Sequence, residues 1–327
     1  MLWVCPACHG GFEKRGAALR CTACAREYGI VAGIPDLRLD SLAWVDFDVD
    51  RNRALLIDAM VERDGLEAAI DDVFVSSRGL TREQAVHRRR QILHGVEKNK
   101  EDIDDWLAPA LASEPAIEVG CGAGQTLAAA ASRGQPLAAV DVSLEWLVIA
   151  KHLVRRYGGE ATLAAGAAEC LPLADGSIGG FISLDVLEHV SDQQVYVREI
   201  ARVLRPGANF ALSTPNRFTL GPEPHVGVWG VGFLPERFQK SWVKLASGRS
   251  YEHTRLLSAF GARKLFEDTG ALSPSIVFPA IPKSDLALFS SGKARLAAMY
   301  NSLIRRGAVQ RLAPFFGAYY RITGQRA

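Results

Sequence analysis

The hydrophobic and polar positions of the chain divide it into three stretches with different patterns. Residues 1–40 hold short apolar runs between turns and end in the breaker cluster Gly33-Ile34-Pro35-Asp36. Residues 41–110 place apolar side chains at helical spacing among mixed charges, which predicts a helical connector and lid. From residue 111 to residue 327, short apolar runs alternate with helical patterns. We therefore expect one large domain behind a small N-terminal module and a helical connector.

The alternation in the large domain predicts an α/β fold. Strands are expected at 116–119, 137–140, 161–163, 180–184, 209–213, 275–278 and 317–322, and helices at 125–132, 146–157 and 195–204. Strands that alternate with helices at this interval favour a parallel, Rossmann-like sheet with helices on both faces. Two insertions, at about 217–255 and 280–314, interrupt the alternation and are expected to wall a pocket.

Two tight pairs of cysteines lie near the N-terminus. Cys5 and Cys8 form one CxxC turn, Cys21 and Cys24 form a second, and twelve residues separate the two turns. Two such turns suit four thiolates arranged tetrahedrally around one Zn²⁺. The alternative is a redox pair, but a thioredoxin-type CxxC would lie in a βαβ unit and would not need a second turn. We predict a structural zinc ribbon.

The stretch that surrounds these cysteines, from Trp3-Val4-Cys5 through Tyr28-Gly29-Ile30 to Gly33-Ile34-Pro35, resembles a known family. It is similar to the zinc-ribbon activator subunit that partners tRNA and release-factor methyltransferases. In that family the ribbon docks on a methyltransferase and stabilises it. The resemblance therefore implies that the ribbon docks on and stabilises a methyltransferase domain in the same chain.

A glycine-rich loop follows the first predicted strand of the large domain. Glu118-Val119-Gly120-Cys121-Gly122-Ala123-Gly124 lies between a strand and a helix, where glycines allow a tight turn and close approach to a ligand. Asp141 ends the next predicted strand, at the position where a carboxylate can accept both hydroxyls of a ribose. The loop resembles the first motif of class I S-adenosylmethionine-dependent methyltransferases, whose glycines hold the amino-acid part of the cofactor.

Three further segments resemble later motifs of the same family, particularly of its ubiquinone-type members. They are Gly166-Ala167-Ala168-Glu169-Cys170-Leu171-Pro172, Ser183-Leu184-Asp185-Val186-Leu187-Glu188-His189-Val190 and Leu204-Arg205-Pro206-Gly207. Ala167 replaces the aspartate that in the family holds the adenine amino group, so backbone, Glu169 or another residue must take that contact. The resemblance implies a class I methyltransferase sheet and the cofactor-binding set Glu118, Gly120, Cys121, Gly122, Gly124, Asp141, Val142, Ala168, Glu169 and Asp185.

Two histidines follow predicted strands and are the candidates for a catalytic base. His189 comes after the fourth strand, where it could instead cap a helix start or pair locally; in ubiquinone-type relatives this neighbourhood faces the acceptor and can bind a metal. His225 lies in the long insertion after the fifth strand, which also carries Trp229 and Phe233 as expected packing surfaces. The alternative for this insertion is a loop folded around its own small core.

The bulk composition limits the function classes. With 38 basic and 36 acidic residues the chain has a formal net charge of +2, without the strong basic field of a dedicated nucleic-acid binder. No apolar run reaches the roughly 18 residues of a membrane span, and the first residues do not read as a signal peptide. The unpaired Cys121 and Cys170 do not suggest a disulfide framework. We expect a cytoplasmic protein without a membrane span.

The sequence thus predicts an enzyme that transfers a methyl group from S-adenosylmethionine to a small-molecule or carrier-linked metabolite, at oxygen, with nitrogen and carbon acceptors still open. An RNA methyltransferase that uses the zinc ribbon for RNA contact is the main alternative. The modest charge and the absence of an Asn-Pro-Pro-Tyr-type signature after the fourth strand argue against it. A non-catalytic scaffold is a third hypothesis, prompted by Ala167, and the intact glycine loop and Asp141 argue against that.

Overall fold

The structure is a computed structural model of the 327-residue chain. It describes all residues except 1, 40–44, 283–285, 287–290 and 305. The chain forms two compact units. Unit 1 comprises residues 1–182 and 202–208, and unit 2 comprises residues 183–201 and 209–327. Among the helices of the described residues, none is both long and apolar enough to cross a lipid bilayer.

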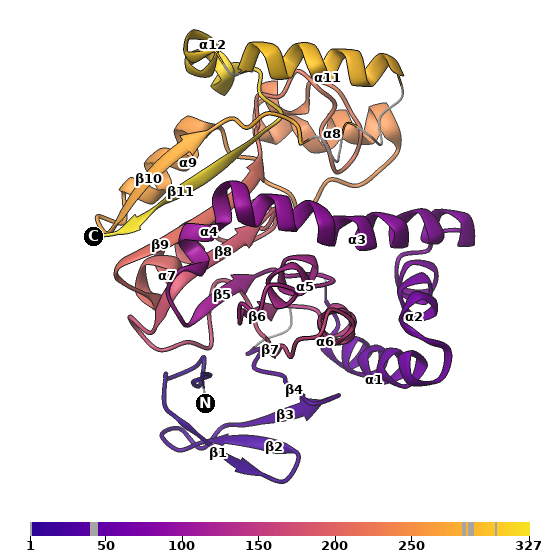
Figure 1. The fold of residues 1–327 in the computed structure, drawn as a ribbon, viewed down its shortest axis with the longest axis vertical. Coiled ribbons are helices and arrows are strands. Elements are labelled where there is room, and N and C mark those ends of the chain that lie inside the picture. The colour runs from indigo at the N-terminus through magenta and orange to yellow at the C-terminus, as the bar shows by residue number, and fades with distance from the viewer. Residues whose placement is uncertain (1, 40–44, 283–285, 287–290, 305) are drawn as a thin grey trace. The chain divides into compact units, whose positions relative to one another are not determined.

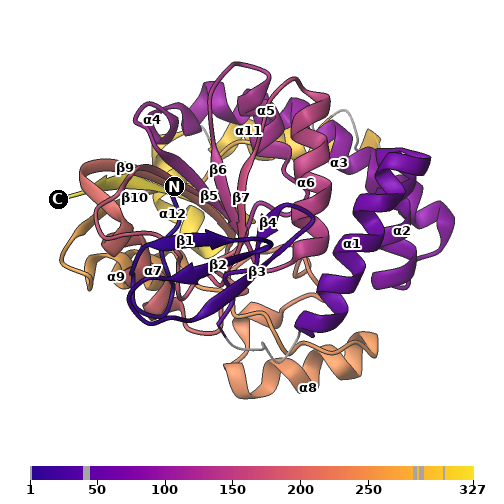
Figure 2. The ribbon, with the colours of Figure 1, turned by 90° about the horizontal axis from the view of Figure 1, so that it is seen from below.

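Unit 1 begins with a small antiparallel sheet (Figure 2). Its strands, in spatial order, are β1 (Phe12–Arg15), β2 (Ala18–Cys21), β3 (Glu27–Val31) and β4 (Ile34–Pro35). Leu19 and Tyr28, which are paired across β2 and β3, are 1% and 5% exposed. Few other large side chains are buried between these strands, so this sheet depends on the cysteine turns beside it.

Helices follow the small sheet in the connector. They are α1 (Phe47–Asp64), α2 (Leu66–Asp72), the π-helix η1 (Val73–Ser77), α3 (Arg82–Asp102), the π-helix η2 (Ile103–Leu107) and α4 (Ala108–Leu111). The longest helix, α3, starts at a capping box in which Thr81 and Gln84 satisfy each other's backbone N–H groups. Helix α1 packs against α6 (Leu144–Arg156), and α3 packs against α5 (Gln125–Ala131). The helical pattern of this stretch therefore reflects real helices packed within unit 1.

The large sheet of unit 1 is parallel. Strand β5 (Ala116–Val119) pairs with β6 (Ala138–Asp141) and with β8 (Ile178–Leu184), and β6 pairs with β7 (Thr162–Ala165). Every residue of β5 and β6 is buried, as expected for strands covered on both faces. Helices α5 (Gln125–Ala131) and α6 (Leu144–Arg156) follow β5 and β6 (Figure 1).

Unit 2 extends this sheet with antiparallel pairing. Strand β11 (Tyr319–Arg326) lies between β9 (Leu204–Pro215) and β10 (Leu272–Val277) and is antiparallel to both. The other elements are α7 (Gln193–Val203), the 3₁₀ turn η3 (Val231–Phe233), α8 (Glu236–Ser247), α9 (Ala259–Glu267), α11 (Ser291–Ile304), α12 (Gly307–Leu312) and the 3₁₀ turn η4 (Ala313–Phe315). Through the strands β8 and β9 that both units share, the order is β10-β11-β9-β8-β5-β6-β7.

The predicted α/β fold with a small N-terminal sheet is confirmed, and the large sheet differs from the expectation in one respect. It is mixed, because the last strand, β11, inserts between two earlier strands in the opposite direction. The alternation of strands and helices gives the elements but not the direction of a final strand.

Candidate functional site

The four N-terminal cysteines lie together in unit 1. Sγ of Cys5 is 3.7 Å from Sγ of Cys24, and Sγ of Cys8 is 3.5 Å from Sγ of Cys21. These separations are far from a disulfide of about 2.05 Å and close to the edge of about 3.8 Å that four sulfurs at 2.3 Å from one Zn²⁺ would form. The Tyr28 hydroxyl lies 3.2 Å from Sγ of Cys5. The cluster thus has the donor set and the spacing of a metal site.

The small sheet docks on the segment that follows β7, within the same unit. Backbone and sulfur groups link it to residues 165–175 through Val4 N to Pro172 O (3.0 Å), Leu37 N to Ala165 O (2.8 Å) and Cys170 Sγ to Pro6 O (3.0 Å). Residues 166–172 are the segment that resembles the adenine-side motif. The ribbon therefore holds this segment by backbone hydrogen bonds.

The glycine loop has a backbone conformation that favours glycine, as expected for the tight turn. Gly120, Gly122 and Gly124 all have positive φ angles, of 76°, 50° and 80°. A side chain at Gly124 would also meet Cβ of Ala150 at 2.6 Å, because α6 packs directly against the loop. The loop therefore needs glycine for both its conformation and its packing.

Asp141 closes this loop from the neighbouring strand. Its two carboxylate oxygens accept hydrogen bonds from Gly122 N (2.8 Å) and from Ser143 N (2.9 Å). Burial raises the pKa of Asp141, although these backbone hydrogen bonds lower it in part. The carboxylate lies at the carboxyl end of β6, where a ribose would be expected.

The other predicted cofactor residues divide between the units. Glu118 is buried in β5, its Oε2 has no hydrogen-bond partner among the described residues, and burial raises its pKa to about 8. Cys121 is buried in the glycine loop, and Val142, Ala168 and Glu169 follow β6 and β7 in unit 1. Asp185 belongs to unit 2, where it has a positive φ angle of 56° and its Oδ1 accepts a hydrogen bond from the Ser213 hydroxyl (2.8 Å).

Unit 2 brings the two predicted catalytic histidines into ring contact. The rings of His189 and His225 have centroids 4.7 Å apart and are nearly perpendicular. Nδ1 of His225 is 2.6 Å from Oε1 of Glu223, and Nε2 of His225 is 3.8 Å from Oε1 of Glu188. That Glu188 oxygen is buried without a hydrogen-bond partner among the described residues. Glu188, His189 and His225 each offer one ligand atom, and these three atoms lie within 4.8 Å of one another.

The electrostatics of this cluster follow from burial and from the carboxylates. Burial disfavours protonated His225, but the hydrogen bond and charge of Glu223 and the charge of Glu188 outweigh it and raise the pKa of His225. Burial lowers the pKa of His189. Burial, together with the charge of Asp185, raises the pKa of Glu188 to about 7. His225 is therefore the more basic of the two imidazoles.

One expectation about this region needs correction, and a second stays a prediction. His189 does not lie at a helix start: it lies in a turn, and α7 begins later, where Asp192 accepts hydrogen bonds from Gln194 N and Val195 N. The expectation that Trp229 and Phe233 are packing surfaces of an acceptor pocket stays a prediction; their side chains are 63% and 51% exposed. The insertion also contains a small core of its own, formed by Val226, Val228, Val231, Val243 and Tyr251.

Sequence reasoning missed Glu223, which is 2% exposed and accepts hydrogen bonds from the backbone N–H groups of His225 and Val226. Its separation of two residues from His225 could have suggested a carboxylate–imidazole pair. The Thr214 hydroxyl, which donates to Oε2 of Glu188 (2.8 Å), comes from β9 and has no such local signal.

Comparison with known proteins decides the family. Residues 117–212 match the family described as the methyltransferase domain. The chain contains an S-adenosylmethionine-dependent methyltransferase domain. A protein of Mycobacterium tuberculosis named as an S-adenosylmethionine-dependent methyltransferase is 33% identical over 156 residues, which cover 48% of this chain and 49% of that protein. The ubiquinone biosynthesis O-methyltransferase of Idiomarina loihiensis is 29% identical over 144 residues, which cover 43% and 54%.

This chain spans about half the length of the curated relatives it matches. Among solved structures, geranyl diphosphate C-methyltransferase from Streptomyces coelicolor is 18% identical, with a TM-score of 0.47 and coverage of 75% of this chain and 81% of that one. A complex of the Haloferax volcanii Trm112 methyltransferase activator with a methyltransferase is 19% identical, with a TM-score of 0.41 and coverage of 69% and 92%.

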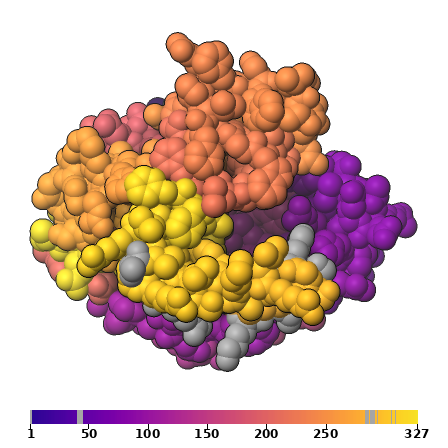
Figure 3. All heavy atoms as spheres, turned by 90° about the horizontal axis from the view of Figure 1, so that it is seen from above, coloured from indigo at the N-terminus to yellow at the C-terminus, as the bar shows by residue number. Residues whose placement is uncertain are grey.

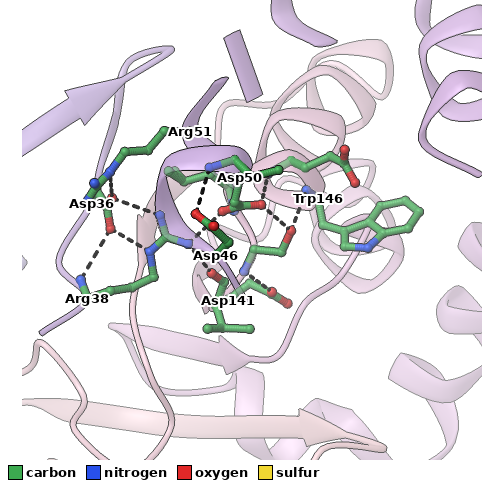
Figure 4. A network of polar contacts seen from close by, with 12 residues as sticks. Asp36, Arg38, Asp46, Asp50, Arg51, Asp141 and Trp146 are labelled. Atoms are coloured by element: carbon green, nitrogen blue, oxygen red, sulfur yellow. Dashed lines mark hydrogen bonds and ion pairs between the residues drawn. The ribbon is translucent and has the colours of Figure 1, made fainter. Parts of the chain in front are cut away.

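A largely buried ion network contacts the residues that follow Asp141 (Figure 4). Arg38, which is 5% exposed, donates to Asp36 (2.7 Å), to Asp50 (2.7 Å) and to the backbone carbonyl of Val142 (2.8 Å). Asp50 in turn accepts hydrogen bonds from the Ser143 hydroxyl (3.0 Å) and from backbone N–H groups at the start of α6. The network thus fixes the residues directly after Asp141.

Replacing Arg38 by alanine is expected to destabilise unit 1 by about 3 kcal/mol, because it leaves the largely buried Asp50 carboxylate without its cation and leaves Asp36 with Arg51 alone. Urea denaturation of the purified protein measures this loss. Arg63→Ala, which removes an exposed Arg63–Asp64 pair on α1, is the control and should leave the unfolding midpoint unchanged. Equal stability of Arg38→Ala and wild type would show that the network is not a structural support.

Proposed function

We propose that this protein transfers a methyl group from S-adenosylmethionine to a hydroxyl of a small-molecule or carrier-linked metabolite. The methyltransferase domain supports the reaction, and the named O-methyltransferases of Idiomarina loihiensis and Pyrenophora dematioidea among its relatives favour oxygen as the acceptor atom. The observation that carries the proposal is the hydrogen bond between the accessible His225 imidazole and the buried Glu223 carboxylate, because an alcohol must lose a proton as it is methylated.

The residues of unit 1 fit the cofactor. A Cβ at Gly122 would meet no atom within 4 Å, so the loop faces open space there, and the buried Glu118 carries an orphaned oxygen behind it. We assign the amino-acid part of the cofactor to Gly120, Gly122 and Gly124. The ribose belongs on Asp141, and the adenine belongs beside Ala168 and Glu169. When bound, the cofactor supplies an activated methyl group on a sulfonium.

His225 is the proposed base. Nδ1 of His225 is hydrogen-bonded to Glu223. Nε2 is therefore the atom that takes the proton from the hydroxyl group of the substrate. The oxygen then takes the methyl group, and the sulfur of the cofactor leaves as the neutral thioether. The negative charges of Glu223 and Glu188 stabilise the imidazolium that forms. His189, through its ring contact, keeps His225 in position.

One metal assignment accompanies this proposal, and a second metal site is an alternative to the His225 base. We assign a structural Zn²⁺ to Cys5, Cys8, Cys21 and Cys24, whose sulfur separations fit a tetrahedral site. Glu188, His189 and His225 also have the donor types and the mutual proximity of a divalent-cation site, and the orphaned Oε1 of Glu188 would be satisfied by one. An ion held there would bind and polarise the acceptor oxygen, in place of a free imidazole base.

A screen of hydroxylated acceptors with radiolabelled S-adenosylmethionine tests the function. His225→Gln is expected to lower kcat by about 10²- to 10⁴-fold on the best acceptor, because the base is lost. The wild-type rate should rise with pH until His225 is deprotonated, at a value above its ordinary pKa of about 6.5. His253→Gln, which changes an exposed histidine of the same unit, is the control.

The alternatives predict different results in the same assay. Label transfer to a tRNA or ribosomal-RNA transcript, with no small acceptor, would identify an RNA methyltransferase. Failure of the wild type to bind S-adenosylhomocysteine would favour the scaffold. If the wild type binds a second equivalent of divalent metal and the His189→Ala variant does not, a cation at this site, and not a free His225 imidazole, would activate the acceptor.

A further inference from the structure

The α8 segment of unit 2 exposes its large apolar side chains. Phe238, Trp242 and Leu245 of α8 are 49%, 41% and 81% exposed. Their spacing of four and three residues puts them on one face of the helix. Trp229 and Phe233, from the loop before α8, are also more than half exposed, and the Trp242 indole donates a hydrogen bond to the Trp229 carbonyl (2.9 Å). We call these five side chains the α8 face.

The exposure of the α8 face does not result from the lack of a hydrophobic core in this segment. The segment already has one, made of Val226, Val228, Val231, Val243 and Tyr251. Val243 is the one buried residue of α8. Within α8 the smaller Val243 is therefore buried while the larger Phe238, Trp242 and Leu245 are exposed, which is the reverse of ordinary packing. An apolar patch of this kind marks an interaction surface.

Positive charge surrounds the α8 face. Residues 217–255 contain six Lys or Arg against three Glu. Within the part of the chain that the structure describes, Arg237, Lys244 and Arg249 form no ion pair, and the Arg237 guanidinium lies 4.8 Å from the centre of the Phe238 ring. Lys244 and Arg249 donate to backbone carbonyls, so no carboxylate of the described residues neutralises these three cations, and they can attract a partner that carries negative charge.

A second helix of unit 2, α11, also combines exposed apolar side chains with an excess of positive charge in its sequence. Leu296, Met299 and Leu303 of α11 are 64%, 57% and 38% exposed, again at spacings of three and four residues. Residues 291–312 contain five Lys or Arg and no Asp or Glu. In Figure 3 the α8 segment, in orange, and α11, in golden yellow, are both open on the face that is shown.

We propose that unit 2 docks on an anionic lipid bilayer through the α8 face and α11. Interfacial helices combine Trp, Phe and Leu with Lys and Arg, so that apolar side chains enter the headgroup region while cations bind lipid phosphates. Since no described helix can cross a bilayer, the protein would lie on the membrane. The exposed aliphatic side chains favour lipid over single-stranded RNA, which binds aromatic rings and cations by stacking and charge.

The docking surface adjoins the proposed catalytic loop. Glu223 N donates to Val228 O (2.8 Å), so the turn that carries His225 leads directly into Trp229. If the proposed function holds, a membrane-dissolved or lipid-linked acceptor would be presented beside this loop. The docking itself does not depend on that function.

Co-sedimentation of the full-length, metal-loaded protein with sucrose-filled vesicles tests the proposal. We expect binding to vesicles of two parts phosphatidylcholine and one part phosphatidylglycerol, weaker binding to pure phosphatidylcholine, and release by salt. Phe238→Ser with Leu245→Ser should weaken partitioning at least about tenfold, because two inserted side chains are lost. Leu55→Ser with Leu56→Ser is the matched control, since these α1 side chains are 52% and 58% exposed.

Absence of wild-type binding to both vesicles would overturn the proposal, as would an equal loss in the α1 control. If the wild type binds polyuridylate but not vesicles, and only the α8 variant loses that binding, the surface would be assigned to nucleic acid instead. The α8 variant should bind S-adenosylhomocysteine as the wild type does. Vesicle binding tests the docking proposal, and cofactor binding and methyl transfer test the proposed function. Because the α8 variant should lose only vesicle binding, the failure of one proposal can be distinguished from the failure of the other.

Discussion

Replacing Cys5 and Cys21 by serine is expected to remove one equivalent of zinc and to weaken the binding of S-adenosylhomocysteine. Both sulfurs are buried, and a structural zinc site contributes about 10 kcal/mol or more of binding free energy, which in a module this small is folding free energy. An unfolded ribbon can no longer hold Pro172 and Ala165 by the hydrogen bonds from Val4 and Leu37. The segment beside the adenine position then loses its support.

Metal analysis, thermal melting and calorimetric titration measure the three consequences. Cys170→Ser is the matched control, because it makes the same chemical change next to the ribbon, outside the cysteine cluster, and keeps a donor for the Pro6 carbonyl. It should retain the zinc. Retention of metal by the double variant would contradict the assignment of the ligands. Loss of metal with unchanged cofactor affinity would contradict the coupling between ribbon and cofactor segment.

The sequence could predict those parts of the molecule whose conformation depends on local chemistry. The glycines at 120, 122 and 124 are needed because each adopts a positive φ angle, and such positions favour glycine in any context. The two CxxC turns are equally local, because two residues between cysteines set the geometry of each turn. Strands β5 and β6 could be predicted within one residue because they are buried on both faces and therefore continuously apolar.

The parts that sequence reasoning missed depend on long-range contacts. Arg38 and Asp50 look like ordinary charged residues, yet they form a buried pair that reaches Val142, 104 positions along the chain from Arg38. The 217–255 insertion was ambiguous, because valines and aromatics are both apolar and only the packed structure decides which of them fill the core. The direction of β11 depends on where a strand enters the sheet, which its own residues do not encode.

Asp141→Asn is expected to raise the dissociation constant for S-adenosylhomocysteine by about 100-fold or more. The wild-type carboxylate would accept both ribose hydroxyls, and a hydrogen bond to a charged group contributes about 1.5–3 kcal/mol. Asparagine removes the charge and offers one acceptor oxygen in place of two. Asp141 also holds Gly122 N and Ser143 N, so the variant should loosen the glycine loop as well.

Asp192→Asn separates these effects from a general loss of structure. Like Asp141, Asp192 accepts hydrogen bonds from two backbone N–H groups, but it caps α7 in unit 2. A weakened cap costs about 1 kcal/mol of stability at most, and cofactor affinity should be unchanged. Equal affinity of Asp141→Asn and wild type would remove Asp141 from the cofactor site. A selective loss in Asp141→Asn, with a melting temperature close to that of Asp192→Asn, would show that this carboxylate supports cofactor binding itself, through the ribose and through the glycine loop that it holds, rather than through overall stability.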